Sequence, residues 1–537
     1  MSDALSIGLT ALVAAQTGIN TTSNNIANAS TIGYSRQSVI QSENISGTGT
    51  QVTDIQRIYD DFLGSQKLSA QSSYSQLQAQ STQLQKISTM FSDPSSGIAA
   101  NMQSFFSSLQ AISITPNDTT SRQSFLSNAD TLVSSFNDAQ SVVDGISKDV
   151  NTQISNSVNN INTIAKQIAS LSSSIFNAQH SANPSAANNL LDTRNTLIAD
   201  LSKIIQVKVV SNGSSTNIFI GNGQPLLIGT SYNQLTTMPS ATNPNNIEVA
   251  FKGSKTPISQ NNLSGGILTG LITFRNNTLP TVQNAIGRIA LGLASSMNTI
   301  NTAGVTLDGT TIGKDLFTVP AIKVSAKTGN SVSASIGVTY GDISKISTSD
   351  YSLQRAADGT YKLIRISDNT LLISGNDSDI TTAAALEGLN ISSLNMSKGD
   401  QFTITPTANV AGGLLLATSK VNDIAAAKTA GLVGDNSNVL KMIALQTDKT
   451  LAIGSLSLTD AYANIVGDIG SKSQALISTS TTANAVLKQA SNALDSVAGV
   501  NLDEEAANLL KYQQAYQAAG KLIAASKLMF DTLFNIA

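Results

Sequence analysis

Both ends of the chain carry residues at the alternating three- and four-residue spacing of a coiled coil. The positions at the start are Leu5, Leu9, Leu12, Gln16, Ile19, Ser23 and Ile26, of which two are polar. The positions at the end are Leu502, Ala506, Leu509, Gln513, Tyr516, Gly520, Ile523, Lys527, Phe530 and Phe534. This period predicts an amphipathic helix at each end of the chain.

Helical patterns of the same kind recur inside the chain. One runs from Leu63 to Phe91 and stops at Asp93-Pro94. Another places Ile154, Ile161, Ile168 and Ile175 seven residues apart. The second pattern predicts a helix over about residues 139–178, roughly 60 Å long at 1.5 Å per residue. Helices of this length indicate rods that pack side by side.

Two internal regions show the signals of β-structure. In the first, strand-like alternation begins at Ile205 and a turn follows at Asn212-Gly213. In the second, Asp358-Gly359 separates two short apolar runs, which predicts a hairpin. The fold class is therefore α+β and multidomain: long coiled-coil-like helices from both ends form a nested rod into which small β domains are inserted.

The domain boundaries follow from these changes of pattern. At 537 residues the chain should hold about three or four domains. We expect a terminal helical domain from residues 1–36 and 500–537, a helical rod from 37–204, 265–305 and 421–499, a small β-rich insertion at 205–264, and an outer β-rich domain at 306–420. From about residue 421 we expect helix to the end of the chain, with breaks at the glycines of 431–434 and 467–470.

Composition excludes several classes of function. The chain has no cysteine and one histidine, so cysteine-based metal sites and thiol nucleophiles are absent. Charged residues are 12% and the net charge is −3, which argues against a nucleic-acid partner. No apolar run reaches the length of a membrane span, and the first basic residue is Arg36, so we expect neither a membrane partner nor a Sec signal.

The chain offers weak candidates for reactive groups. His180 follows the predicted long helix and is interpreted as a surface histidine. The segment from Gly309 to Asp315 is one residue too short for a phosphate-binding loop and has an acid where the magnesium-binding hydroxyl belongs. Adjacent acids, as in Asp60-Asp61 and Glu504-Glu505, do not face each other on a helix. We therefore expect no catalytic, cofactor-binding or metal-binding residue, and not an enzyme.

The terminal seams allow two interpretations. An apolar helical stripe usually covers an internal core, and the two ends could pair with each other inside one molecule. A lone two-helix hairpin buries little area, however, and both ends are nearly uncharged, which favours packing between molecules. The predicted self-assembly seam consists of Leu5, Leu9, Leu12, Ile19, Ile26, Leu502, Leu509, Tyr516, Ile523, Phe530 and Phe534.

The flanks of these seams resemble a known family. The segment Ala27-Asn28-Ala-Ser-Thr-Ile-Gly33-Tyr34-Ser-Arg36 is similar to the motif near the start of flagellar axial proteins. The segment from Val500 to Ala519, with its Asp-Glu-Glu-Ala-Ala-Asn start, resembles the FlgK family of flagellar hook-associated proteins. The motif residues are Asn28, Gly33, Tyr34 and Arg36. Ile32 departs from the family, which usually has proline before the glycine.

The resemblance implies a fold, a location and partners. Proteins of this family leave the cell unfolded through the flagellar type III export channel and assemble at the tip of the hook, at the hook–filament junction. Their terminal helices pack into concentric tubes and their β domains project outward. The implied partners are further copies of the chain, the hook protein, the third hook-associated (adaptor) protein, and a cytosolic export chaperone at the C-terminal region.

Two other functions stay open on the sequence. A secreted adhesin with a helical stalk would use residues 306–420 as its recognition domain. A flagellar filament subunit would share the paired helical ends. A secreted hydrolase is disfavoured, because a single histidine and no Gly-x-Ser-x-Gly elbow accompany the many serines.

Overall fold

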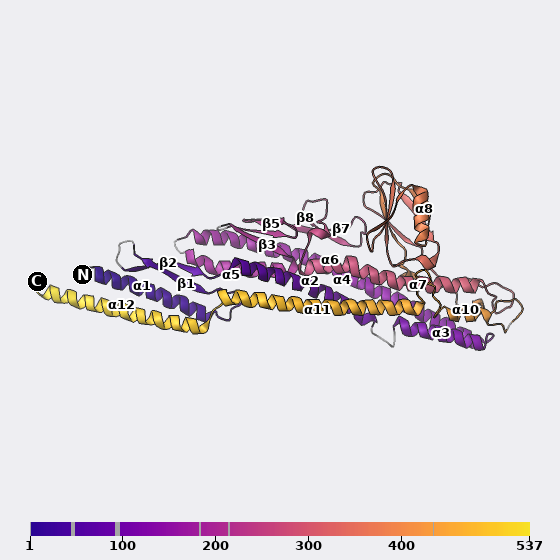
Figure 1. Ribbon diagram of the computed structural model, residues 1–537, viewed down its shortest axis with the longest axis horizontal. Helices are drawn as coiled ribbons and strands as arrows, with labels where there is room; N and C mark the ends of the chain where they lie inside the picture. The colour runs from indigo at the N-terminus through magenta and orange to yellow at the C-terminus, as the bar shows by residue number, and fades with distance from the viewer. Residues whose placement is uncertain are drawn as a thin grey trace.

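The computed structural model describes residues 2–44, 49–91, 97–181, 184–212, 215–432 and 434–536. These residues form an elongated molecule (Figure 1). The helices α1 (Ser2–Ala27) and α12 (Leu502–Ile536) lie side by side at one end, where both chain termini are found. A helical rod follows, and a β domain stands on one side of the rod near its far end. The predicted α+β architecture with long helices from both ends is confirmed.

The rod is built from long helices that are separated in sequence. They are α2 (Asp61–Phe91), α3 (Ile98–Ile114), α4 (Thr119–Gln179), α5 (Ala187–Ile204), α6 (Gly266–Thr273), α7 (Leu279–Thr302), α10 (Ser437–Ala444) and α11 (Leu458–Ala498). The four isoleucines predicted as a seam, Ile154, Ile161, Ile168 and Ile175, are all fully buried in α4. Ala70, Leu84, Ile87 and Phe91 of α2 are buried as well. These positions of the heptad patterns inside the chain are therefore buried within the rod.

The helix α4 is longer than its pattern predicted. It has 61 residues, about 90 Å at 1.5 Å per residue, and begins at Thr119 rather than near residue 139. The Asp118 carboxylate caps the helix by accepting hydrogen bonds from the Thr120 and Ser121 amides, at 3.2 and 2.8 Å. Phe125 and Phe136 are fully buried in the added turns. The cap and these aromatic residues were the signals for the earlier start.

The glycine break predicted at 467–470 is wrong. The helix α11 continues through Gly467 and Gly470, which both face open space. A glycine inside a helix costs about 1 kcal/mol relative to alanine. Ile465 and Ile469 on the opposite side of the same turns are buried in the rod, and this packing outweighs the glycine cost. Tertiary contacts therefore override local propensity here.

Two segments assigned to the helical rod are not helical. Residues 37–57 hold an antiparallel hairpin of β1 (Gln37–Glu43) and β2 (Thr50–Arg57). Among the described residues of 421–436, the chain has a 3-10 turn at Val421–Asp423 and an isolated β-bridge at Ala427, and α10 begins at Ser437. The buried Arg122 side chain holds this return segment by donating to the carbonyls of Val421 and Ile424, at 3.1 and 2.6 Å. These two hydrogen bonds join residues that are 299 and 302 positions apart in the sequence, so no local sequence pattern predicts them.

A small β region follows α5 in the chain. A four-stranded antiparallel sheet has the order β3-β4-β5-β6, and β7 pairs with β8. Its strands are β3 (Val207–Asn212), β4 (Ser215–Ile220), β5 (Gln224–Ile228), β6 (Ser231–Tyr232), β7 (Leu235–Pro239) and β8 (Ile247–Phe251). Figure 1 shows these strands lying along the side of the rod. The Asn162 side chain of α4 bonds both backbone groups of Leu235, at 2.8 Å each, which ties β7 to the rod.

The outer β domain centres on a five-stranded antiparallel sheet of order β10-β16-β12-β13-β14. Its elements are β10 (Lys323–Ala326), β11 (Ser335–Tyr340), β12 (Tyr351–Arg355), β13 (Tyr361–Arg365), β14 (Thr370–Gly375), α8 (Asp377–Leu386), β15 (Leu389–Asn395) and β16 (Gln401–Thr405). At its base β9 (Phe317–Thr318) pairs with β17 (Leu415–Leu416), next to the short helix α9 (Val410–Gly413). The predicted hairpin is confirmed: β12 pairs with β13, and Gly359 in the turn has φ +94°.

One continuous core joins the rod to both β regions. The strand residues Ile218 and Leu353 belong to the same buried cluster as Ile161 of α4. Within the described ranges, no helix is both long and apolar enough to span a membrane. The described side chains of the terminal helices α1 and α12 do not belong to that cluster, so these helices pack outside the main core.

Candidate assembly site

The two terminal helices meet through small residues. The buried residues of α1 within the described part of the chain are small or polar: Gly8, Ala14, Ala15, Gly18, Thr21, Thr22 and Asn25. Of these, Gly8 and Gly18 lie against α12, whereas Asn25 bonds Gln37 of β1. A Cβ atom added at Gly18 would lie 2.5 Å from Tyr512 Cδ1, and one added at Gly8 would lie 2.8 Å from Ile523 Cγ1. Without side chains at these two positions, the helices approach closely enough for Tyr512 and Ile523 to pack directly on the α1 backbone.

The helix α12 presents a matching line of residues spaced seven apart. Glu505, Ala519 and Ser526 are buried, and Tyr512 between them is half-buried. Because Gly18 faces Tyr512 and Gly8 faces Ile523, the two helices run antiparallel. Figure 1 shows the resulting hairpin extending beyond the end of the rod. This small-residue interface was not part of the predicted seam; the glycines at a ten-residue separation were its only sequence signal.

The large apolar residues of α1 lie on the opposite side of the helix. Leu5, Leu9 and Val13 are exposed, and Leu12 is half-buried. At about 100° per residue these four positions centre roughly 125° away from the middle of the face that holds Gly8 and Gly18. They form the outer stripe of α1, defined here as Leu5, Leu9, Leu12 and Val13. The fully buried residues of α1 are therefore small or polar, whereas Leu5, Leu9 and Val13 stay exposed.

The predicted seam residues differ in how far they are buried in the structure. Leu5, Leu9, Leu502, Tyr516 and Phe530 are exposed, whereas Leu12, Ile19, Ile26, Leu509 and Ile523 are half-buried. Phe534 lies within α12, but its side chain is outside the described residues. On α12, further exposed apolar residues are Leu510, Leu522, Leu528 and Met529. The structure thus brings Ile523 against α1 and leaves most of the other large residues on outward faces.

The motif residues 28–36 form the joint between this hairpin and the rod. Asn28 closes the end of α1, its side-chain amide donating to the Asn24 carbonyl at 3.0 Å. Gly33 has φ +84° and lies against Thr196, so it needs both its backbone freedom and its missing side chain. Tyr34 Oη donates to Asn25 Oδ1 at 2.7 Å. Burial, with the nearby Asp192 and Glu505 carboxylates adding to it, raises the pKa of Tyr34 to about 12.

Arg36 connects the joint to both C-terminal helices. Its backbone amide donates to the Ala498 carbonyl at the end of α11, at 2.8 Å. Its guanidinium pairs with Glu504 of α12 at 2.7 Å. Glu504 is well exposed, so this pair contributes little stability by itself. The contacts instead align the outgoing and returning arms of the chain.

Asp192 of α5 anchors the joint to the rod. Its carboxylate accepts from the Ser35 amide at 3.1 Å and from Arg57 Nε at 2.5 Å. Both side chains of the Arg57–Asp192 pair are about nine-tenths buried. The Arg57 guanidinium also lies 4.2 Å from the centroid of the Tyr59 ring. Breaking a buried pair leaves an uncompensated charge, so this network holds the motif firmly on α5.

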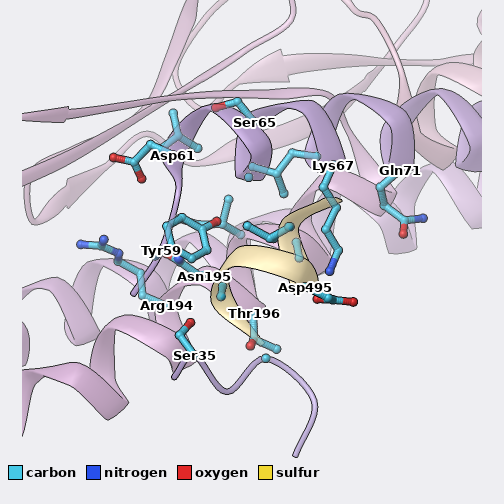
Figure 2. A pocket seen from close by; sticks show the side chains of 18 of the residues that line it. Ser35, Tyr59, Asp61, Ser65, Lys67, Gln71, Arg194, Asn195, Thr196 and Asp495 are labelled. Carbon is cyan, nitrogen blue, oxygen red and sulfur yellow. The ribbon is translucent and has the colours of Figure 1, made fainter. Parts of the chain in front are cut away.

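A pocket of about 410 Å³ lies beside the joint, between α2, α5 and α11. Lys67 of α2, Asn195 of α5 and Asp495 of α11 contribute to its wall (Figure 2). Burial raises the pKa of Tyr59 and lowers the pKa of Arg194, both of which line the pocket. The lining carries both signs of charge beside apolar groups such as Leu68 and Ile198.

The residues considered as possible catalytic or phosphate-binding groups make structural contacts. His180 is exposed just after α4, with Nδ1 2.7 Å from the Phe176 carbonyl and its ring 4.2 Å from the Phe176 ring. The segment from Gly309 to Asp315 follows a tight turn in which Asp308 accepts from the Thr310 and Thr311 amides, at 2.9 and 2.8 Å. Within the part of the chain that the structure describes, no group of three or more His, Cys, Asp or Glu residues could hold a metal ion.

These features define a class of protein: an elongated structural subunit whose two chain ends pair into a helical hairpin with uncovered apolar faces, and whose β domains project from a helical rod. Four family models match the chain. Their descriptions are flagellar hook-associated protein FlgK helical domain (residues 84–317), flagellar hook-associated protein 1, D2-like domain (325–406), flagellar basal body rod FlgEFG protein C-terminal (490–536) and flagella basal body rod protein (5–34).

The similarity to known proteins extends over all or most of the chain. Flagellar hook-associated protein 1 of Escherichia coli (strain K12) is 33% identical over 550 residues, which span 100% of both chains. The protein of the same name from Bacillus subtilis (strain 168) is 24% identical and covers 98% of this chain and 96% of its own. The solved structure of the flagellar hook junction protein FlgK from Burkholderia pseudomallei matches with a TM-score of 0.74 at 25% identity, covering 81% of this chain and 100% of that one.

The chain therefore belongs to the flagellar hook-associated protein 1 family, and it is a hook-associated structural component of the bacterial flagellum. The resemblance drawn from Asn28, Gly33, Tyr34 and Arg36 and from the segment after Val500 is confirmed. The domain boundaries and the individual assembly residues stay predictions.

Proposed function

We propose that this chain forms the short segment that joins the flagellar hook to the filament, outside the cell. The observation that carries the proposal is the pairing of both chain ends into one hairpin whose outer stripe on α1 is apolar and is exposed at Leu5, Leu9 and Val13. Large exposed apolar surfaces on a protein mark sites of contact with other proteins. The role is structural and non-catalytic.

Copies of the chain are the first partner. In the proposed arrangement the hairpins of neighbouring copies pack side by side into a helical tube, in a ring or short helical segment. The outer stripe of α1 and the exposed residues Leu502, Tyr516 and Phe530 of α12 form the contacts. The rods surround this tube and the β domains face outward. The hook protein and the third hook-associated, adaptor protein bind at opposite ends of the segment.

Export precedes this assembly. We infer that the chain leaves the cell unfolded through the flagellar type III channel and that a cytosolic chaperone covers its C-terminal region beforehand. The exposed faces of α12 support this inference, because a helix with so little cover is marginally stable in water. Docking onto the hook then supplies the missing contacts, so that folding of the hairpin is coupled to assembly.

The test is removal of the gene, followed by electron microscopy of the cells and an assay of flagellin in the medium. We expect hooks without filaments and free flagellin in the supernatant, and restoration by the intact gene. Normal filaments would contradict the junction role. If the chain were instead the most abundant protein of sheared flagella, it would be a filament subunit; glycan binding by residues 306–420 on an array would favour an adhesin.

A further inference from the structure

Methionine carries all the sulfur of this chain, because the sequence has eight methionines and no cysteine. Four of the methionines that the structure describes are at most 4% exposed: Met102, Met297, Met396 and Met442. Met90 and Met238 are half-buried. Met529 of α12 differs from all of these, because it is 50% exposed. A flexible apolar side chain of the kind that fills gaps in cores therefore stands in solvent at this described position.

Met529 lies on an outward flank of the terminal hairpin. The helix α12 packs mainly on α1 (Figure 1). Ser526 belongs to the buried line of α12 that faces α1, and Met529, three residues further on, is turned about 60° away from that line. Leu522, seven residues before Met529, is 38% exposed on the same flank. The sulfur thus belongs to an apolar surface that the isolated chain leaves exposed.

An exposed thioether reacts with hydrogen peroxide in a two-electron step. The peroxide transfers one oxygen atom to the methionine sulfur, which is oxidised to the sulfoxide, and the peroxide is reduced to water. A sulfur inside a core is reached only when the surrounding structure opens. The exposure of the side chains therefore predicts the order of oxidation: Met529 first, the half-buried Met90 and Met238 next, and the four buried methionines last.

The product differs from methionine in polarity. The sulfoxide oxygen accepts hydrogen bonds, so oxidation turns an apolar side chain into a polar one. On the isolated chain this oxygen stays hydrated, because Met529 is exposed, and the stability of the fold should change little. In a contact between copies the oxygen would lose its water beside the apolar Leu522, Leu528 and Phe530, which offer no side-chain donor. Oxidation therefore acts on association rather than on folding.

We propose that Met529 is an oxidation site that switches assembly: peroxide converts Met529 of the free chain to the sulfoxide, and the modified chain no longer packs against further copies. The inference rests on the proposed function, because it requires the outward flank of α12 to be covered in the assembled segment. The same cover protects Met529 once a copy is in place. The switch excludes oxidised copies before they are incorporated and leaves assembled copies intact.

Peptide mass mapping tests the site. The full chain in solution and flagella purified from cells are exposed to hydrogen peroxide for increasing times, and the gain of one oxygen atom is followed at each methionine. In the free chain we expect Met529 to be oxidised roughly tenfold faster than Met90 or Met238. In assembled flagella the rate at Met529 should fall about tenfold. Equal rates at Met529 and Met238 in the free chain, or an unchanged rate at Met529 after assembly, would overturn the inference.

Addition of the chain to cells that lack the gene tests the switch. The purified chain is added with or without prior peroxide treatment, and filaments are counted by electron microscopy. We expect the treated wild type to restore about tenfold fewer filaments than the untreated wild type, and methionine sulfoxide reductase to reverse the loss. For Met529→Leu, treated and untreated samples should restore equal numbers. Met238→Leu is the matched control and should lose activity on treatment as the wild type does.

The outcomes separate this inference from the proposed function. Normal filament numbers from wild-type chain that is oxidised at Met529 would contradict the switch, and so would an equal loss in Met529→Leu. A lower unfolding temperature of the oxidised chain would assign the loss to unfolding and would also overturn the inference. If the untreated wild type restores no filaments, the proposed function itself fails.

Discussion

At the residue scale, the terminal hairpin depends on two glycines of α1 rather than on its leucines. Gly18 and Gly8 lie directly beneath Tyr512 and Ile523. Both glycines also lower the intrinsic helix propensity of α1. The close packing of the two helices offsets this loss of helix propensity. A prediction based on the spacing of large apolar residues does not detect an interface that depends on glycines.

The substitution Gly18→Ala should loosen the hairpin. The added methyl group would lie 2.5 Å from the Tyr512 ring, and overpacking of this kind costs roughly 1–3 kcal/mol. Hydrogen exchange of the α1 amides in the full chain measures the effect and should become faster. Gly520→Ala on α12 is the control, because its methyl group meets open space and should slow exchange slightly. Equal protection of α1 in Gly18→Ala and the wild type would contradict the interface.

At the element scale, the outer β domain is joined to the rod through buried polar groups. Asn284 of α7 donates to Asp350 Oδ1 at 3.2 Å and accepts from Thr407 Oγ1 at 2.7 Å. Burial raises the pKa of Asp350 to about 6, although the Asn284 hydrogen bond and the Lys323 charge act in the opposite direction. The contact between domain and rod therefore contains a carboxyl group that ionises less readily than a free aspartate.

The raised pKa predicts a pH dependence with a definite sign. Because the folded-state pKa exceeds the unfolded value, ionisation of Asp350 disfavours the folded state. Its destabilising effect should grow from about pH 4 to pH 6 and level off above, reaching roughly 2–3 kcal/mol. Thermal unfolding of the wild type and of Asp350→Asn across this range isolates the contribution. The stability of the wild type relative to the variant should fall as pH rises; a constant difference would rule the effect out.

At the scale of the whole molecule, the two faces of α1 have separate tasks. The glycine face holds the hairpin together, and the outer stripe is free to contact neighbouring copies. Leu9 is 57% exposed, so in the isolated chain Leu9→Asp should change the free energy of unfolding by no more than about 0.5 kcal/mol. In an assembled tube the same substitution would bury an unpaired charge, which costs several kcal/mol.

We therefore expect cells with Leu9→Asp to secrete the protein without retaining it on hooks. Immunoblots of the hook fraction and of the culture medium measure the distribution, and filament counts follow it. Leu9→Met keeps the apolar volume and should behave as the wild type. Filaments at normal number in Leu9→Asp would show that the outer stripe is not a buried contact.

The sequence by itself determined the elements whose causes are local. The heptads of α2, α4 and the chain ends, the β12–β13 hairpin around Gly359 and the family motif at residues 28–36 were all predictable, because periodicity and turn chemistry act over a few residues. The charge and cysteine content likewise excluded whole classes of chemistry, because folding cannot supply a side chain that the sequence lacks.

Tertiary structure alone decided the rest. It selected the glycine face of α1 over its leucine face, carried α11 through Gly467 and Gly470, and joined Ser35 to Asp192 across 157 residues. These outcomes depend on which distant segments pack together. A contact between distant segments produces no periodic pattern in the sequence of either segment, so it cannot be predicted from local sequence.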